Sequence, residues 1–93
     1  MNALQLFINA LEKRLNTNGD HRGAFVCRQN VEVGTFKAYK TYIQEVWNVD
    51  GSNKQLVAKA EYKARVTNDE EKAQALENLY HLTVMEVLKY YGI

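Results

Sequence analysis

The chain has a single cysteine and no proline. Cys27 has no second cysteine to pair with, so no disulfide can form within the chain, and we expect a small buried hydrophobic residue in a reducing compartment. No charged-then-apolar leader opens the sequence, and no uncharged segment is long enough to span a bilayer. The sequence therefore predicts a cytoplasmic protein that does not associate with membranes.

Motifs that carry chemistry are lacking as well. The five glycines are isolated, so no run of backbone N–H groups forms a phosphate loop. His21, Cys27 and His81 are scattered and lack the close paired spacing of zinc ligands. The segment 50–53 has oxygen ligands but no glutamate at the distance a calcium loop requires, which indicates a turn. We expect no catalytic residue, no cofactor and no metal, and an enzyme is the least favoured class.

The composition fits one small domain. A chain of 93 residues with 46% hydrophobic and 25% charged residues is large enough for one core, and we predict a single α+β domain over residues 1–93. The net charge of +1 is unevenly spread. Residues 51–67 hold four cations against one carboxylate, whereas residues 68–93 hold two cations against five carboxylates. Such an asymmetry guides the association of partners or copies and says nothing about the fold.

Two segments have helical spacing. In the first, Asn2 and Gln5 form a capping pattern, and an Asn- and Gly-rich exit follows at 16–20. Its apolar residues recur every three or four positions: Leu4, Phe7, Ile8, Leu11 and Leu15. The last segment runs from the cap Asn68 to the exit at Gly92. Its predicted core face consists of Ala73, Leu76, Leu79, Tyr80, Val84, Val87, Tyr90 and Tyr91.

The middle of the chain alternates with the two-residue period of strands. Residues 23–33 and 56–66 both place apolar and polar side chains in turn. The segment 36–49 has apolar residues at positions that suit either a helix or a strand, but it is rich in aromatic and β-branched residues and runs into the turn at 50–53. A strand is therefore favoured over a helix. Trp47 is predicted to lie on the core side of this strand, in step with Tyr39 and Ile43.

The order helix, strand, strand, strand, helix predicts a three-stranded antiparallel sheet with both helices on one face and the other face open. This order resembles that of the double-stranded RNA-binding domain, which contacts phosphates through basic residues at the start of its second helix. Here residues 68–72 read Asn-Asp-Glu-Glu-Lys, and their carboxylates repel phosphate. The resemblance is confined to topology and implies no binding residue.

Two surfaces are candidates for binding. Leu82, Met85 and Leu88 fall on the otherwise polar side of the last helix, where a second protein, a further copy of the chain or the first helix is expected to cover them. The open sheet face is the second candidate, with basic and aromatic residues suited to nucleic acid: Lys40, Tyr42, Lys59, Lys63 and Arg65. The favoured hypothesis is a non-enzymatic interaction or assembly protein, oligomeric or part of a larger complex. A small nucleic-acid-binding module is the alternative.

Overall fold

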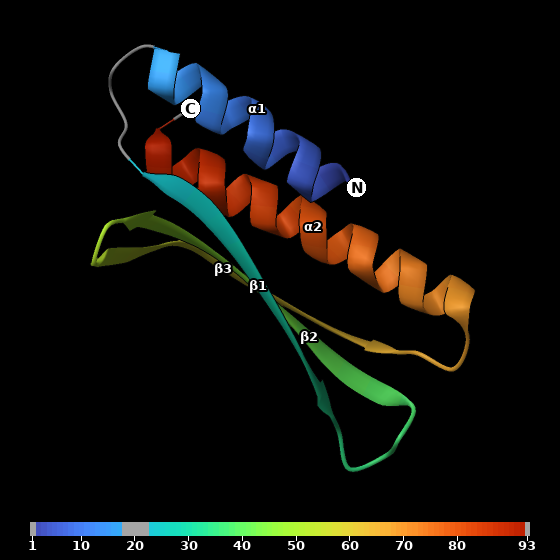
Figure 1. Cartoon of the computed structure of the whole chain (residues 1–93). Coiled ribbons are helices and arrows are strands. Elements are labelled where there is room, and N and C mark those ends of the chain that lie inside the picture. The colour runs from blue at the N-terminus through green and yellow to red at the C-terminus, as the bar shows by residue number, and fades with distance from the viewer. Residues whose placement is uncertain (1, 18–22, 93) are drawn as a thin grey trace.

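The computed structural model describes residues 2–17 and 23–92, and its elements follow the predicted order (Figure 1). The elements are α1 (Ala3–Thr17), β1 (Ala24–Val33), β2 (Tyr39–Asp50), β3 (Asn53–Arg65) and α2 (Asp69–Tyr91). The α+β prediction is confirmed, as is the preference for a strand in the segment before Asp50. His21 and most of the predicted helix exit at 16–20 lie outside the described residues.

Local hydrogen bonds fix the ends of both helices. The side-chain oxygen of Asn2 accepts from the backbone N–H of Gln5 at 2.8 Å, and that of Asn68 accepts from Glu71 at 2.8 Å. Gly92 has φ 70°, a left-handed conformation that ends α2, and its N–H points to carbonyls of the last turn. The predicted N-terminal caps of both helices and the predicted exit of α2 at Gly92 are therefore confirmed.

The three strands form an antiparallel meander in the order β1-β2-β3. Gly51, at φ 61°, supplies the left-handed residue of the tight turn between β2 and β3. The β2–β3 register shifts at Val46 and Trp47, which pair with Ala58 and Leu56 respectively. Val57 is the extra residue of this bulge, so Val57 and Ala58 are both buried.

Both helices cover the same face of the sheet, but they cover different lengths of it (Figure 1). α2 runs along β2 and β3, whereas α1 lies beside the C-terminal half of α2 and over the beginning of β1. At this end, Leu4, Ile8 and Leu11 of α1 pack with Phe25 and Val46 of the sheet. A second cluster beneath the first half of α2 consists of Tyr42, Ala60, Val66, Ala75 and Leu79.

Gln44 lies on β2 between the residues of these two clusters. Its side chain is buried, and its Nε2 donates to the carbonyl oxygens of Arg28 and Glu45, each at 3.2 Å. The amide is therefore satisfied where it interrupts the apolar row.

The buried side of α2 is rotated from the predicted one. Ala75, Leu79, Thr83 and Val87 are buried. The predicted core positions Ala73 and Tyr90 are exposed, so their assignment was wrong. Thr83 occupies the centre of the interface because its hydroxyl donates to the carbonyl of Leu79 at 2.7 Å within the same helix and needs no partner from the sheet.

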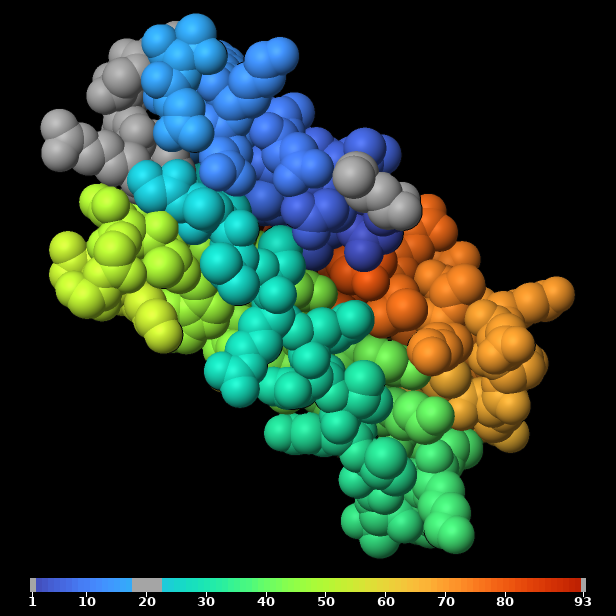
Figure 2. All heavy atoms as spheres, in the orientation of Figure 1, coloured from blue at the N-terminus to red at the C-terminus, as the bar shows by residue number. Residues whose placement is uncertain are grey.

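The molecule is elongated, with extents of 47 × 24 × 22 Å. Its Cα radius of gyration is 14.6 Å, against roughly 12 Å for a compact domain of this length. The excess comes from the β1–β2 hairpin, whose turn projects beyond the helices (Figure 2). Val33 and Phe36 in this projection are 62% and 73% exposed.

Candidate binding surfaces

The strand β2 determines which side chains face the helices. Tyr42, Gln44 and Val46 point into the core, and Tyr42 is only 1% exposed. Successive residues of a strand face opposite sides, so Ile43 and Trp47 lie on the open face. The predicted position of Trp47 on the core side was therefore wrong. β2 has apolar residues at both even-numbered and odd-numbered positions, so the alternation of residue types does not show which of its faces is buried.

The residues proposed for nucleic-acid binding lie on both faces of the sheet, because strand alternation separates them. Lys59, Lys63 and Arg65 are exposed and lie on the open face, as predicted. Tyr42 is instead part of the core. Lys40 shares the parity of Tyr42 and faces the helix side of the sheet, half-buried. The placement of Lys40 and Tyr42 beside the other three was wrong, because they are an even number of residues from Val46 on the strand that carries the core.

An apolar cluster occupies the open face around Trp47. Val26 of β1 and Leu56 of β3 are the direct cross-strand neighbours of Trp47, and both are exposed. The Trp47 patch comprises Val26, Trp47, Val49 and Leu56. A shallow hollow of 250 Å³ adjoins it, lined by Val26, Arg28, Trp47, Val49 and Lys54. A half-buried indole beside a hollow with a cationic rim is the arrangement expected of a contact surface.

Charges on the open face largely compensate one another. Arg28, Glu45 and Lys59 are direct neighbours across the three strands, so the carboxylate lies between two cations. Lys59 also approaches Glu61, with Nζ and Oε1 3.9 Å apart. The face holds the cations Arg28, Lys54, Lys59, Lys63 and Arg65 and the carboxylates Glu32, Glu45 and Glu61, which leaves a net charge of +2.

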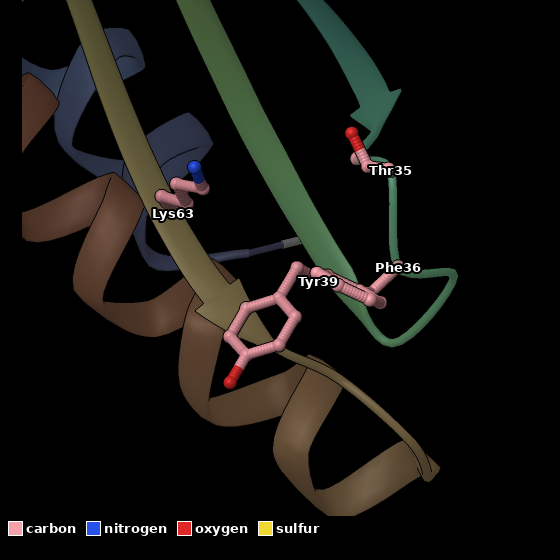
Figure 3. Close-up of a pocket in the computed structure, with 5 residues that line it drawn as sticks. Thr35, Phe36, Tyr39 and Lys63 are labelled. Carbon is pink, nitrogen blue, oxygen red and sulfur yellow. The ribbon is translucent and has the colours of Figure 1, made fainter.

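The projecting end carries a second hollow, of 420 Å³, lined by Gly34, Thr35, Phe36, Tyr39 and Lys63. Figure 3 shows the ring of Tyr39 crossing the end of β3, with Lys63 earlier on that strand and Thr35 and Phe36 on the β1–β2 turn. Tyr39 pairs with Arg65, so aromatic and basic side chains are adjacent here. Sequence reasoning missed this site because Phe36 was assigned to the strand and not to the turn.

The three residues proposed as an interface on α2 lie in two hollows. Leu82 and Met85 line one of 270 Å³ with Lys59, Ala60 and Glu61 of β3, and Met85 is 56% exposed. Leu88 lines another, of 170 Å³, with Phe7, Ala10, Leu11 and Arg14 of α1. Leu82, Met85 and Leu88 are three residues apart, and each such step turns the side chain by about 300° around the helix axis. The three residues therefore do not share one face, and their direction changes from the β3 side toward α1. The first helix therefore covers Leu88 in part, the alternative considered for this patch.

The described residues offer little reactive chemistry. Burial raises the pKa of the Cys27 thiol, which lowers the fraction of thiolate at neutral pH. Burial and the neighbouring Tyr90 raise the pKa of Tyr91 to about 12. His81 is exposed on α2. Within residues 2–17 and 23–92, no group of three or more His, Cys, Asp or Glu side chains is arranged to hold a metal ion.

Comparisons with known proteins do not place the chain in a family. No family model, no curated protein and no solved structure matches it. Neither helix of the described chain is sufficiently long and apolar to cross a membrane.

Proposed function

We propose that the protein is a non-enzymatic assembly module that binds another protein through the open face of its sheet. The observation that supports this is the Trp47 patch, a contiguous apolar cluster on the face that neither helix covers. An open face of an antiparallel sheet ordinarily carries polar residues at these positions.

The composition of the patch favours a protein partner. Fully burying a large apolar side chain contributes about 1.5–3 kcal/mol, and tryptophan is among the residues that dominate protein interfaces. Arg28 and Lys54 border the hollow beside Trp47, and the face as a whole has a net charge of +2. The expected partner surface has an apolar centre and a rim with an excess of carboxylates.

Nucleic acid fits this face less well. Phosphate binding depends on cations that are free to exchange their counterions. Glu45 lies between Arg28 and Lys59 near the middle of the face, and Glu61 approaches Lys59. The adjacent Tyr39, Lys63 and Arg65 are the part of the face that suits a single strand of nucleic acid. Binding of nucleic acid at these residues is the alternative that the experiment below tests.

Trp47 is the sole tryptophan, and its fluorescence reports directly on the patch. A photo-crosslinking residue replacing Leu56 in the organism of origin captures whatever protein covers Trp47. Titration of that purified protein is expected to shift Trp47 emission to the blue and to protect it from acrylamide. Trp47→Ser should weaken binding at least tenfold, while the matched control Met85→Ser, an exposed apolar residue on α2, should not.

A labelled single strand of nucleic acid is titrated in parallel at low and high salt. Salt-sensitive binding that survives Trp47→Ser but is lost in Lys63→Glu with Arg65→Glu would overturn the proposal in favour of the nucleic-acid alternative.

A further inference from the structure

The two edge strands of the sheet differ in how they are protected. β3 carries a bulge and the charged residues Lys54, Lys59, Lys63 and Arg65, devices that discourage pairing with another strand. β1 is ten residues long, is paired to β2 without a bulge, and contains neither lysine nor proline. Among the described residues no strand lies on its outer side. A long, regular edge whose only charges are one arginine and one glutamate is a template for strand addition.

Two hydrogen bonds show which backbone groups of β1 point toward β2 and which point to its outer edge. The N–H of Gly34 donates to the carbonyl of Tyr39 at 2.8 Å, and the carbonyl of Arg28 accepts from the β2 side chain of Gln44. Even-numbered residues of β1 therefore direct their backbone groups toward β2. The N–H and C=O groups of Cys27, Gln29, Val31 and Val33 point away from the sheet.

The side chains along β1 are self-complementary about Asn30. We infer that two copies of this chain pair antiparallel along β1, with Asn30 opposite Asn30 of the second copy. Arg28 then lies opposite Glu32 of the second copy, and the two-fold axis repeats this ion pair. Centring the pairing on Arg28 or on Glu32 places like charges directly opposite each other.

This register also satisfies the outward backbone groups. Residues whose numbers add to 60 face each other, so Cys27 pairs with Val33 of the second copy and Gln29 with its Val31. These are the residues with outward backbone groups, and they form about eight main-chain hydrogen bonds across the axis. The result is a continuous six-stranded sheet.

Incomplete helical cover on β1 supports the same arrangement. Cys27 packs against the cluster that includes Leu4 and Ile8 of α1, whereas Val31 and Val33 extend past α1 and are 48% and 62% exposed. In the dimer, Val33 lies beside Cys27 of the second copy. Cys27 is in the part of β1 that α1 of the second copy covers. Each copy therefore supplies the helix that the other lacks over this half of β1, and apolar surface leaves water.

The dimer does not depend on the proposed function. Its axis is perpendicular to the sheet, so both open faces lie on the same side, with the two Trp47 patches toward opposite ends of the β1–β1 pair. Trp47 itself lies on β2 and makes no part of the β1 contact. Failure of either proposal is therefore visible while the other holds.

The sole cysteine gives a direct test of the register. Val33→Cys places a thiol opposite Cys27 of the second copy, at the Cα separation of about 5.5 Å that a disulfide spans. Within one chain these positions are roughly 20 Å apart along the strand and cannot join. Mild oxidation is expected to give a covalent dimer on non-reducing gels. Val33→Cys combined with Cys27→Ala should give none, because the two introduced thiols are far apart across the axis.

Charge reversal tests the ion pairs by light scattering coupled to size exclusion. Glu32→Arg should raise the dimer dissociation constant at least tenfold, since Arg28 then faces arginine, and adding Arg28→Glu should restore part of the loss. Thermal melting at dilute concentration checks that each variant folds. A wild-type chain that is monomeric at every concentration, together with a Val33→Cys variant that cross-links no more than Val33→Cys with Cys27→Ala, overturns the inference. So does a dimer insensitive to Glu32→Arg.

Discussion

The two ends of the sheet are built differently. Where α1 and α2 both cover it, the sheet has a continuous apolar core with Leu4, Ile8 and Val46 at its centre. At the other end only α2 covers the sheet, and the β1–β2 turn extends into solvent with Phe36 and Val33 exposed (Figure 1). The comparison suggests that the two-helix end supplies most of the folding free energy. The projecting end is then free to carry residues that contribute to contacts rather than to stability.

The largest expected effect is at the two-helix end. Ile8 is fully buried in the cluster that joins α1 to the sheet. Ile8→Ala should lower the free energy of unfolding by about 2–5 kcal/mol, because it removes buried methyl groups and leaves a cavity. A urea titration measures the change. A loss below about 0.5 kcal/mol would mean that α1 adds little to the core, and would contradict the claim that the two-helix end supplies most of the folding free energy.

A smaller effect is expected at the start of α2, which lies over the less covered end. Asn68 holds the first turn by accepting from the N–H of Glu71, and Glu71 follows Asp69 and Glu70 at the positive end of the helix dipole. Asn68→Ala should cost about 1 kcal/mol, while Asn68→Ser should cost less because serine retains the acceptor. Equal losses in both variants, measured by thermal melting, argue against the capping role.

These features differ in how far the sequence determines them. The element order, the caps at Asn2 and Asn68 and the strand around Trp47 follow from local patterns, and the structure agrees with them. The side of Trp47 did not follow, because β2 is central and apolar on both faces. The rotation of α2 depended on Thr83, whose hydroxyl is satisfied within its own helix and therefore tolerates burial. Those two outcomes are set by tertiary packing, which local sequence patterns do not specify.

The pH dependence of stability provides a further test of the two-helix end. Tyr91 packs edge-on against Phe25, with ring centroids 6.0 Å apart, and burial raises its pKa from 10.0 to about 12. The folded state holds this proton more tightly than the unfolded chain, so the associated stability is fully present below pH 10 and is lost as pH rises toward 12. Tyr91→Phe should flatten the fall in melting temperature over that window. If the melting temperatures of wild type and Tyr91→Phe fall in parallel between pH 10 and 12, the raised pKa of Tyr91 does not account for the loss of stability.

The smallest effect is expected at the tip of the projecting hairpin. Phe36 is 73% exposed, and its backbone carbonyl accepts from the N–H of Tyr39 to close the turn. Phe36→Ser retains that backbone hydrogen bond and removes a ring that is already mostly in water, so the free energy of unfolding should change by less than about 0.5 kcal/mol. The measurement is made on dilute protein, so that association through β1 does not contribute. Val46→Ala, fully buried on β2, is the matched control and should cost roughly 2 kcal/mol, because it leaves a cavity between α1 and the sheet. A Phe36→Ser loss as large as that of Val46→Ala shows that the turn is packed in solution and that both ends of the sheet support the fold equally.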